Sequence, residues 1–176
     1  MRLYLVDDHP DLIEALRHAF AAFPEVSVTC GNILAVAENT LVSPANSRGY
    51  MDGGIDRRYL DFFGQRLQQT VQEAIQRRPE GLLPVGAALI VATGSPRIPY
   101  LIVAPTMTEP ERIEADHCYR AMRAILRIAE QHAEIVEGVY CPGLGTGVGG
   151  VSFSDAARAM AEAYANWKVK RTGGGR

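Results

Sequence analysis

Short apolar runs that alternate with stretches of helical periodicity are the feature that most constrains the fold of this chain. Residues 2–6 read as a strand, and after an acidic turn apolar residues recur at helical spacing from Leu12 to Phe23. Further elements are expected as strands over 26–29, around Leu41 and Val42, and over 85–92, 100–104 and 135–141, and as helices over 55–76, from Thr108 onward and after a cap at Ser154 and Asp155. This alternation predicts a layered α/β fold, with a sheet in the middle and helices on both of its faces. Ligands of such folds collect at the loops beyond the strand ends.

The length of 176 residues suits one domain with a hydrophobic core of its own. We expect a single domain over residues 1–168 and a flexible C-terminal tail over 169–176, because residues 171–176 have no apolar side chains to bury.

Charge and cysteine content exclude several classes of protein. The formal net charge is −2, and the sequence has no basic cluster, so we expect neither nucleic acid nor a membrane as a partner. The three cysteines, at positions 30, 118 and 141, have no CxxC spacing, which favours neither a disulfide framework nor a zinc site. Acidic residues near the N-terminus and the lack of a long apolar run argue against a secretory signal or a membrane span. A reduced, cytoplasmic location without a metal or cofactor is the expectation.

Residues 141–150, Cys-Pro-Gly-Leu-Gly-Thr-Gly-Val-Gly-Gly, form the most glycine-dense stretch, and five of these ten residues are glycine. Without a Cβ, glycine lets main-chain N–H groups approach a ligand closely, which is how a loop can hold a diphosphate. Glycine-rich loops also make plain turns, so the loop alone leaves both interpretations open.

Asp7 and Asp8, after the opening strand, resemble the metal-binding start of a bacterial response-regulator receiver domain. A receiver also needs a phospho-accepting Asp at a later strand end and a Lys after another strand. Asp52 lies in a glycine-rich break, and no Lys precedes Lys168. We therefore interpret Asp7 and Asp8 as a solvated strand end and helix start.

Four later segments resemble the macro domain family, in the right order and over roughly residues 28–165. Residues 31–33, Gly-Asn-Ile, lie where the family has a Gly-Asp-Ile turn. Residues 42–46, Val-Ser-Pro-Ala-Asn, are similar to the strand end that the family writes as VNAAN. Residues 52–56, Asp-Gly-Gly-Ile-Asp, are similar to its glycine run before a helix, and residues 145–148 are similar to its late phosphate-contacting loop. The resemblance implies a macro domain fold, which is a three-layer α/β/α sandwich with a mixed, mostly parallel central sheet. It also implies a cleft that binds ADP-ribose.

The same resemblance assigns roles to individual residues. Asn32 lies where the family has an Asp that binds the adenine amino group, and its side-chain carbonyl is expected to accept from that amine. Asn46 matches the Asn that contacts the distal ribose, and Asp56 matches the catalytic Asp. Gly149 replaces an aromatic residue that commonly packs on the distal ribose, which would open the site to a bulkier substrate.

The catalytic residues implied in this way are Asp56 and Asn46, and the ligand-binding residues are Asn32, Ile33, Ala45, Asp52, Gly53, Gly54, Ile55, Gly143, Leu144, Gly145, Thr146, Gly147, Val148 and Gly149. Because the chain lacks a basic cluster, the two phosphates would be bound by neutral N–H groups of two glycine-rich segments and by a helix N-terminus.

Three functions remain open at this stage. The first is an enzyme that removes ADP-ribose from an acidic side chain, or an acyl group from acyl-ADP-ribose, with Asp56 as base and Asn46 as positioner. The second is a binding module that holds ADP-ribose or an ADP-ribosylated protein without turnover. The third is a macro-like scaffold with a vestigial pocket. Simpler interpretations also stay open, since Asp56 can cap the following helix and Asn46 can form an Asx turn.

Overall fold

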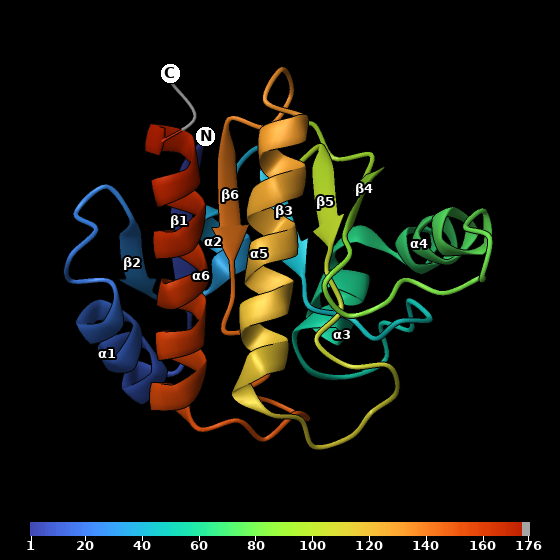
Figure 1. Cartoon of the computed structure of the whole chain (residues 1–176). Helices are drawn as coiled ribbons and strands as arrows, with labels where there is room; N and C mark the ends of the chain where they lie inside the picture. The colour runs from blue at the N-terminus through green and yellow to red at the C-terminus, as the bar shows by residue number, and fades with distance from the viewer. Residues whose placement is uncertain (174–176) are drawn as a thin grey trace.

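The structure, a computed structural model, describes residues 1–173, and a six-stranded sheet forms the centre of this part of the chain (Figure 1). The strands are β1 (Arg2–Asp7), β2 (Ser27–Cys30), β3 (Thr40–Ser43), β4 (Leu89–Ala92), β5 (Tyr100–Val103) and β6 (Gly138–Cys141), in the order β2-β1-β6-β3-β5-β4. Every neighbouring pair is parallel except β4 and β5, which are antiparallel. The mixed, mostly parallel sheet predicted from the sequence is confirmed.

Helices cover both faces of the sheet, namely α1 (Pro10–Ala19), α2 (Ile33–Val36), α3 (Gly54–Phe63), α4 (Arg66–Gln76), α5 (Ala115–Gln131) and α6 (Phe153–Gly173). Successive side chains of a strand point to opposite faces, so each strand contributes to two cores. Leu5 packs with α1, α5 and α6, whereas Val6 packs with residues of α2, α3 and α4. Two cores on either side of one sheet give the three-layer α/β/α architecture.

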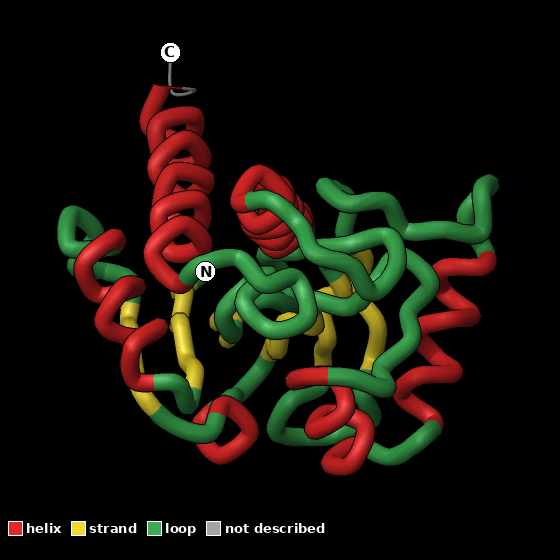
Figure 2. Tube along the Cα trace, turned by 90° about the horizontal axis from the view of Figure 1, so that it is seen from below, coloured by secondary structure: helices red, strands yellow, loops and turns green. Residues whose placement is uncertain are grey.

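The carboxyl ends of the five parallel strands share one edge of the sheet, which Figure 2 shows from below. The strand order therefore places the loops after β2, β1, β6, β3 and β5 side by side in that sequence. The loop after β6, residues 142–152, lies in the middle of this series. Residues that are far apart in the sequence can thus line one site at this edge.

The helix expected over 55–76 is two helices in the structure. Gly64 has a φ of +91°, a conformation that L side chains rarely adopt, and it ends α3 as its C-cap. Helix α4 then begins at Arg66. Apolar residues on both sides of the break keep near-helical spacing, which is why the sequence pattern did not reveal it.

Three other elements begin later in the sequence than expected. Strand β4 begins at Leu89 instead of residue 85, since residues 84–87 form a turn in which the Ala87 N–H donates to Pro84 O. Strand β6 begins at Gly138 instead of residue 135. Helix α5 begins at Ala115, not near Thr108, because the Ile113 N–H donates to Gly149 O and holds the preceding segment as a loop.

The C-terminal helix differs from expectation at both ends. Its cap is Ser152, whose Oγ accepts from the Asp155 N–H at 3.2 Å, so the expected cap at Ser154 and Asp155 is wrong by two residues. Helix α6 continues through Gly173, past the expected domain boundary at residue 168, and Arg171 forms an ion pair with Glu130. Residues 174–176 of the expected tail lie outside the described residues. Within residues 1–173, no helix has the length and apolar character needed to cross a membrane.

Candidate functional site

A cavity of about 480 Å³ lies at the carboxyl edge of the sheet, where the strand order brings the loops together. Most of the residues predicted from the sequence line it: Ala45, Asn46, Asp52, Gly53, Gly54, Ile55, Asp56, Gly143, Gly145, Thr146, Gly147, Val148 and Gly149. Three predicted residues, Asn32, Ile33 and Leu144, do not line it. Ile33 and Leu144 are core residues, 2% and 0% exposed.

Residues 52–56, the first wall of the cavity, form the start of α3. Gly53 is the N-cap, no side chain of residues 1–173 caps this helix end, and a Cβ added at Gly53 or Gly54 would meet no atom within 4 Å. The first N–H groups of a helix have no acceptor within it, and the helix dipole places partial positive charge there. The first wall therefore offers uncapped N–H donors beside open space, which suits an anion.

Asp56 lies in the first turn of α3, yet its carboxylate is buried, and the residue is only 6% exposed. Its Oδ1 accepts from Ser43 Oγ at 2.5 Å, at the end of β3. Burial raises the pKa of Asp56 to about 7, although the hydrogen bond from Ser43 opposes the shift by stabilising the charged form. Asp56 therefore does not act as the helix cap; it is a carboxyl group whose pKa lies near neutrality at a cavity wall.

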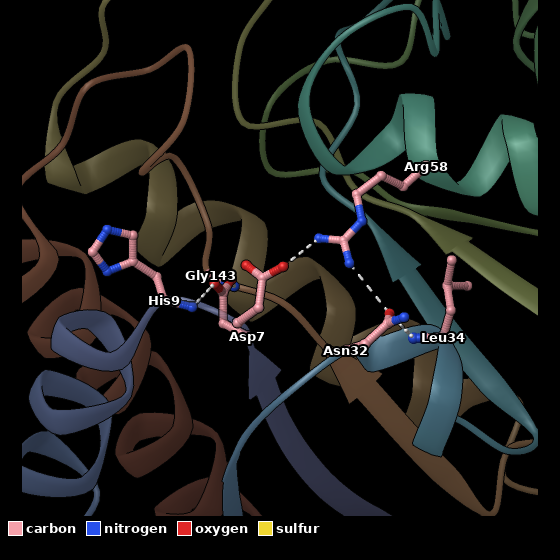
Figure 3. Close-up of polar contacts among 7 residues, drawn as sticks. Asp7, His9, Asn32, Leu34, Arg58 and Gly143 are labelled. Carbon is pink, nitrogen blue, oxygen red and sulfur yellow. Dashed lines mark hydrogen bonds and ion pairs between the residues drawn. The ribbon is translucent and has the colours of Figure 1, made fainter.

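Residues 142–150, the second wall, follow β6 at the centre of the edge. The Gly143 N–H donates to Asp7 Oδ2 at 3.1 Å, which fastens the start of the loop to the end of β1 (Figure 3). No atom of residues 1–173 accepts a hydrogen bond from the N–H groups of residues 146–149. Gly147 is open, since a Cβ there would meet nothing within 4 Å. The second wall thus also presents main-chain donors without partners.

Gly149 has a different role from the one expected. A Cβ at this position would lie 2.6 Å from Gly145 O and 2.8 Å from Ile113 Cγ1. Ile113, in the loop before α5, fills the space, and its N–H donates to Gly149 O at 3.0 Å. The expectation that the missing aromatic side chain leaves an opening at Gly149 is therefore wrong, because the glycine is needed for close packing.

Asn46 lies on the cavity wall, and its amide mainly holds its own loop. Its Oδ1 accepts from the N–H groups of Arg48 at 3.1 Å and Tyr50 at 3.3 Å, and its Nδ2 donates to Tyr50 O. This is the Asx turn that the sequence left as an alternative. One amide hydrogen of Nδ2 has no acceptor among the described residues and remains free for a ligand.

Asn32 does not have the free carbonyl that the sequence interpretation required. Its Oδ1 accepts from the Leu34 N–H at 3.1 Å, which caps α2, and from Arg58 at 3.3 Å (Figure 3). The oxygen has two lone pairs, and these two donors occupy both. Arg58 also donates to Asp8 at 2.7 Å, so its guanidinium links the ends of β1 and β2 to α3.

Several lining residues were missed or dismissed. Asp7, Asp8 and His9 lie at the end of β1, at the same edge as the glycine-rich loop, and Arg58 of α3 donates to Asp8. The rings of His9 and Phe153 lie 4.4 Å apart and form an aromatic part of the lining. Asp7 and Asp8 could have been assigned to the site from the sequence, since they lie at the end of a predicted strand and the carboxyl ends of parallel strands meet at one edge of a sheet. Pro44 and Pro142 lie inside residues 42–46 and 141–150, two segments that the sequence had singled out without giving these prolines a role. Other lining residues carried no sequence signal for a site: Leu12, Tyr50, Thr106, Met107 and Pro110.

Residues 1–173 contain no group of His, Cys, Asp or Glu side chains arranged to hold a metal ion. The two buried cysteines are poor nucleophiles: burial raises the pKa of the Cys118 thiol to about 12 and that of the Cys141 thiol well above its ordinary value. The chemistry available at the cavity is that of main-chain N–H donors, the buried Asp56 carboxyl group, and polar and charged side chains that include Asp8, His9 and Arg58.

Comparisons with known proteins agree with this architecture. Residues 42–160 match the Macro domain family. An uncharacterized protein of Aquifex aeolicus is 37% identical over 147 residues, which cover 83% of this chain and 84% of that protein. One of Aeropyrum pernix is 35% identical over 139 residues, which cover 78% of this chain and 69% of that protein.

Solved structures with the same fold include the macrodomain of Mycobacterium tuberculosis DarG, with a TM-score of 0.67 at 21% identity over 78% of this chain and 88% of that one. A mutant of the Oceanobacillus iheyensis macrodomain with ADPR has a TM-score of 0.67 at 19% identity, over 77% and 74% of the two chains. The Trypanosoma brucei macrodomain in complex with ADP has a TM-score of 0.64 at 19% identity, over 82% and 57%.

Proposed function

The chain belongs to the Macro domain family, and from this premise we propose that its cavity binds ADP-ribose or a close derivative. Structures of similar fold hold ADPR or ADP. The observation that carries the proposal is the pair of glycine-containing walls, residues 52–56 and 142–150, whose N–H donors without partners border one cavity. Such donors bind phosphate oxygens without a cationic side chain.

The strand order suggests how the ligand lies. The second wall is at the middle of the edge, so the diphosphate belongs there, opposite the N-terminus of α3. One sugar then lies toward the end of β3, beside Asn46 and Asp56. The base lies toward the ends of β1 and β2, where the rings of His9 and Phe153 offer an apolar surface.

At the base end, Asp8 is the acceptor best suited to an amino group. The carbonyl of Asn32 is already occupied by Leu34 and Arg58. Asp8 lines the cavity, and its Oδ2 accepts from Arg58, while no described residue donates to its Oδ1. Its Oδ1 is available to accept from the amine of an adenine, and Arg58 holds the carboxylate in place.

We further propose that the protein hydrolyses an ester at the distal ribose. Asp56 in its ionised form takes a proton from a water molecule, whose oxygen bonds to the carbonyl carbon of the ester while the bond from that carbon to the ribose oxygen breaks. The departing ribose oxygen takes the proton from Asp56, so that a carboxylic acid and a ribose hydroxyl are formed and Asp56 is ionised again. The free hydrogen of Asn46 Nδ2 positions the ribose. A base of pKa about 7 is well matched to neutral pH, and general base catalysis contributes typically ~10²–10⁴-fold in rate.

Calorimetric titration with ADP-ribose tests the binding proposal, and the absence of any binding would contradict it. Release of ADP-ribose from an automodified protein tests the reaction. Asp56→Asn is expected to lower this rate by about 10²–10⁴-fold while ADP-ribose still binds. Binding without release by the wild-type protein would instead identify a binding module.

Ser43→Ala separates a catalytic carboxylate from a structural one. Removing the hydrogen bond to the charged form of Asp56 raises its pKa further, by about one unit or more. If Asp56 is the base, the acidic limb of the rate–pH profile moves to higher pH by the same amount. A profile that stays in place would contradict this role.

A further inference from the structure

A groove of about 420 Å³ lies between α5 and α6, the two long helices that pack together on one face of the sheet (Figure 1). It is separate from the cavity at the strand ends, with which it shares no lining residue. Its walls are formed by Tyr119, Arg123, Arg127 and Glu130 of α5 and by Asn166, Trp167, Lys170 and Arg171 of α6.

Hydrogen bonds hold the walls of this groove in place. Glu130 accepts from Trp167 Nε1 at 3.2 Å and pairs with Arg171 at 3.1 Å. The Arg171 guanidinium lies 4.8 Å from the centre of the Trp167 ring. Across the groove, Asn166 donates to the Tyr119 hydroxyl at 3.2 Å. Two aromatic rings and one carboxylate are thus fixed between the helices.

The cations in the groove exceed the anions. Arg171 neutralises Glu130, the only acidic residue among the described residues of the lining. Arg127 donates to the neutral carbonyl of Gly86, and within residues 1–173 no carboxylate pairs with its charge. The side chains of Arg123 and Lys170 form no ion pair or hydrogen bond with any described residue. Three uncompensated positive charges therefore gather in one groove of a chain whose formal net charge is −2.

This arrangement arises from helix geometry and could not be read as a cluster in the sequence. Arg123 and Arg127 are four residues apart and share one face of α5. Lys170 and Arg171 come from α6, about forty residues further on, and packing brings them opposite. No basic cluster is visible along the chain because these residues are separated in sequence.

We propose that the groove between α5 and α6 is a second ligand site, for molecules that carry two or more linked phosphate groups. Guanidinium groups bind phosphate oxygens through paired hydrogen bonds, and several phosphates relieve the repulsion among the three cations. The volume falls in the range of small-molecule sites, and the rings of Tyr119 and Trp167 give it apolar sides. Such phosphates come either from a free nucleotide or from a single-stranded nucleic acid.

Trp167 is the sole tryptophan of the chain, so its fluorescence reports on this groove directly. We would titrate the protein at low salt with inorganic tripolyphosphate and, separately, with a ten-residue oligothymidylate. Saturable quenching or enhancement is expected with at least one of them. If neither changes the Trp167 signal, and calorimetry shows no binding, the proposal is overturned.

A matched pair of double variants assigns the site. Arg123→Glu with Lys170→Glu is expected to weaken binding at least tenfold and to reduce the salt dependence of log K by about two. Arg66→Glu with Arg77→Glu, at exposed positions at the two ends of α4, changes the net charge equally and is expected to leave binding nearly unchanged. Equal losses in both variants, or no loss in the first, would overturn the proposal.

Two controls complete the test. If the glutamate variant has a lowered melting temperature, Arg123→Gln with Lys170→Gln replaces it, and the same comparison applies. Tighter binding of the oligothymidylate than of tripolyphosphate identifies a nucleic-acid strand as the source of the phosphates, and the reverse order identifies a free oligophosphate. Both orders support the site, which does not depend on ADP-ribose binding at the other cavity.

Discussion

The two walls of the cavity both contain glycines, and they use them for different purposes. In the first wall, the Cβ positions of Gly53 and Gly54 point into open space. In the second, a Cβ at Gly143 would lie 2.4 Å from Leu12, and at Gly149 it would lie 2.6 Å from a carbonyl oxygen. Only Gly147 of the second wall resembles those of the first. Some glycines therefore leave room for a ligand, and others allow the protein to pack on itself.

The first wall also contains a destabilising group, since it buries the Asp56 carboxyl, whereas the second wall contains no ionisable side chain. The contrast shows that glycine content alone does not identify the residues that meet a ligand. Four substitutions test it, in order of expected size.

The largest effect concerns pH and Asp56. Its pKa is about 7 in the folded protein, against 3.8 for an exposed aspartate. At pH values between these two pKa values, Asp56 therefore holds a proton in the native state that it has lost in the unfolded state. Stability therefore falls as pH rises from about 4 to about 7, by up to about 4 kcal/mol. Asp56→Asn removes this slope. Chemical denaturation of the wild-type protein and the variant at pH 5 and pH 8 measures the change in unfolding free energy with pH. An equal change in the two proteins would contradict a raised pKa for the buried Asp56 carboxyl.

Gly149→Ala is the next largest and concerns the second wall. Its Cβ would meet the Gly145 carbonyl oxygen and Ile113, so the loop has to shift. We expect a loss of about 2–3 kcal/mol in unfolding free energy and a melting temperature lower by roughly 4–12 °C. Gly147→Ala is the matched control, with a change within about 0.5 kcal/mol, since its Cβ meets nothing. Similar losses of unfolding free energy in the two variants would contradict the distinction between a packed glycine at 149 and an open one at 147.

Gly147→Val tests the open glycine of the second wall. The side chain would extend into the cavity beside the N–H groups of residues 146–149, so we expect ADP-ribose affinity to fall at least tenfold, about 1.4 kcal/mol. Calorimetry measures the affinity, and a melting curve like that of the wild-type protein shows that the fold is intact. Unchanged affinity would mean that the diphosphate does not contact this wall.

The smallest effect is expected at Arg58. Its ion pair with Asp8 is largely exposed, with side-chain exposures of 41% and 57%, so Arg58→Ala is expected to cost less than about 1 kcal/mol. Arg57→Ala, which removes an exposed pair with Asp61 on the same helix, is the control. Under the proposed ligand placement, only Arg58→Ala weakens ADP-ribose binding. Equal ADP-ribose affinities of the two variants would mean that Asp8 and Arg58 do not contact the adenine.

Much of the site could be predicted because it depends on local sequence. The sequence placed Gly53-Gly54 before a helix and a glycine-rich loop after a strand. The structure has both segments in these places, and both line the cavity. The prediction failed at Asn32, where a cap on Leu34 and a contact with Arg58 occupy the carbonyl. Arg58 lies 26 residues away, and no local pattern reveals such a contact.

The sequence by itself determined the alternation of strands and helices, the parallel sheet and the two glycine-rich segments, because periodicity and backbone freedom are local properties. The tertiary structure decided which glycines face the cavity, how deeply Asp56 is buried beside Ser43, and that Ile113 fills the space at Gly149. It also gathered the cations of α5 and α6 into one groove. These features depend on which distant segments pack together, and that is fixed only when the layers of the fold close on each other.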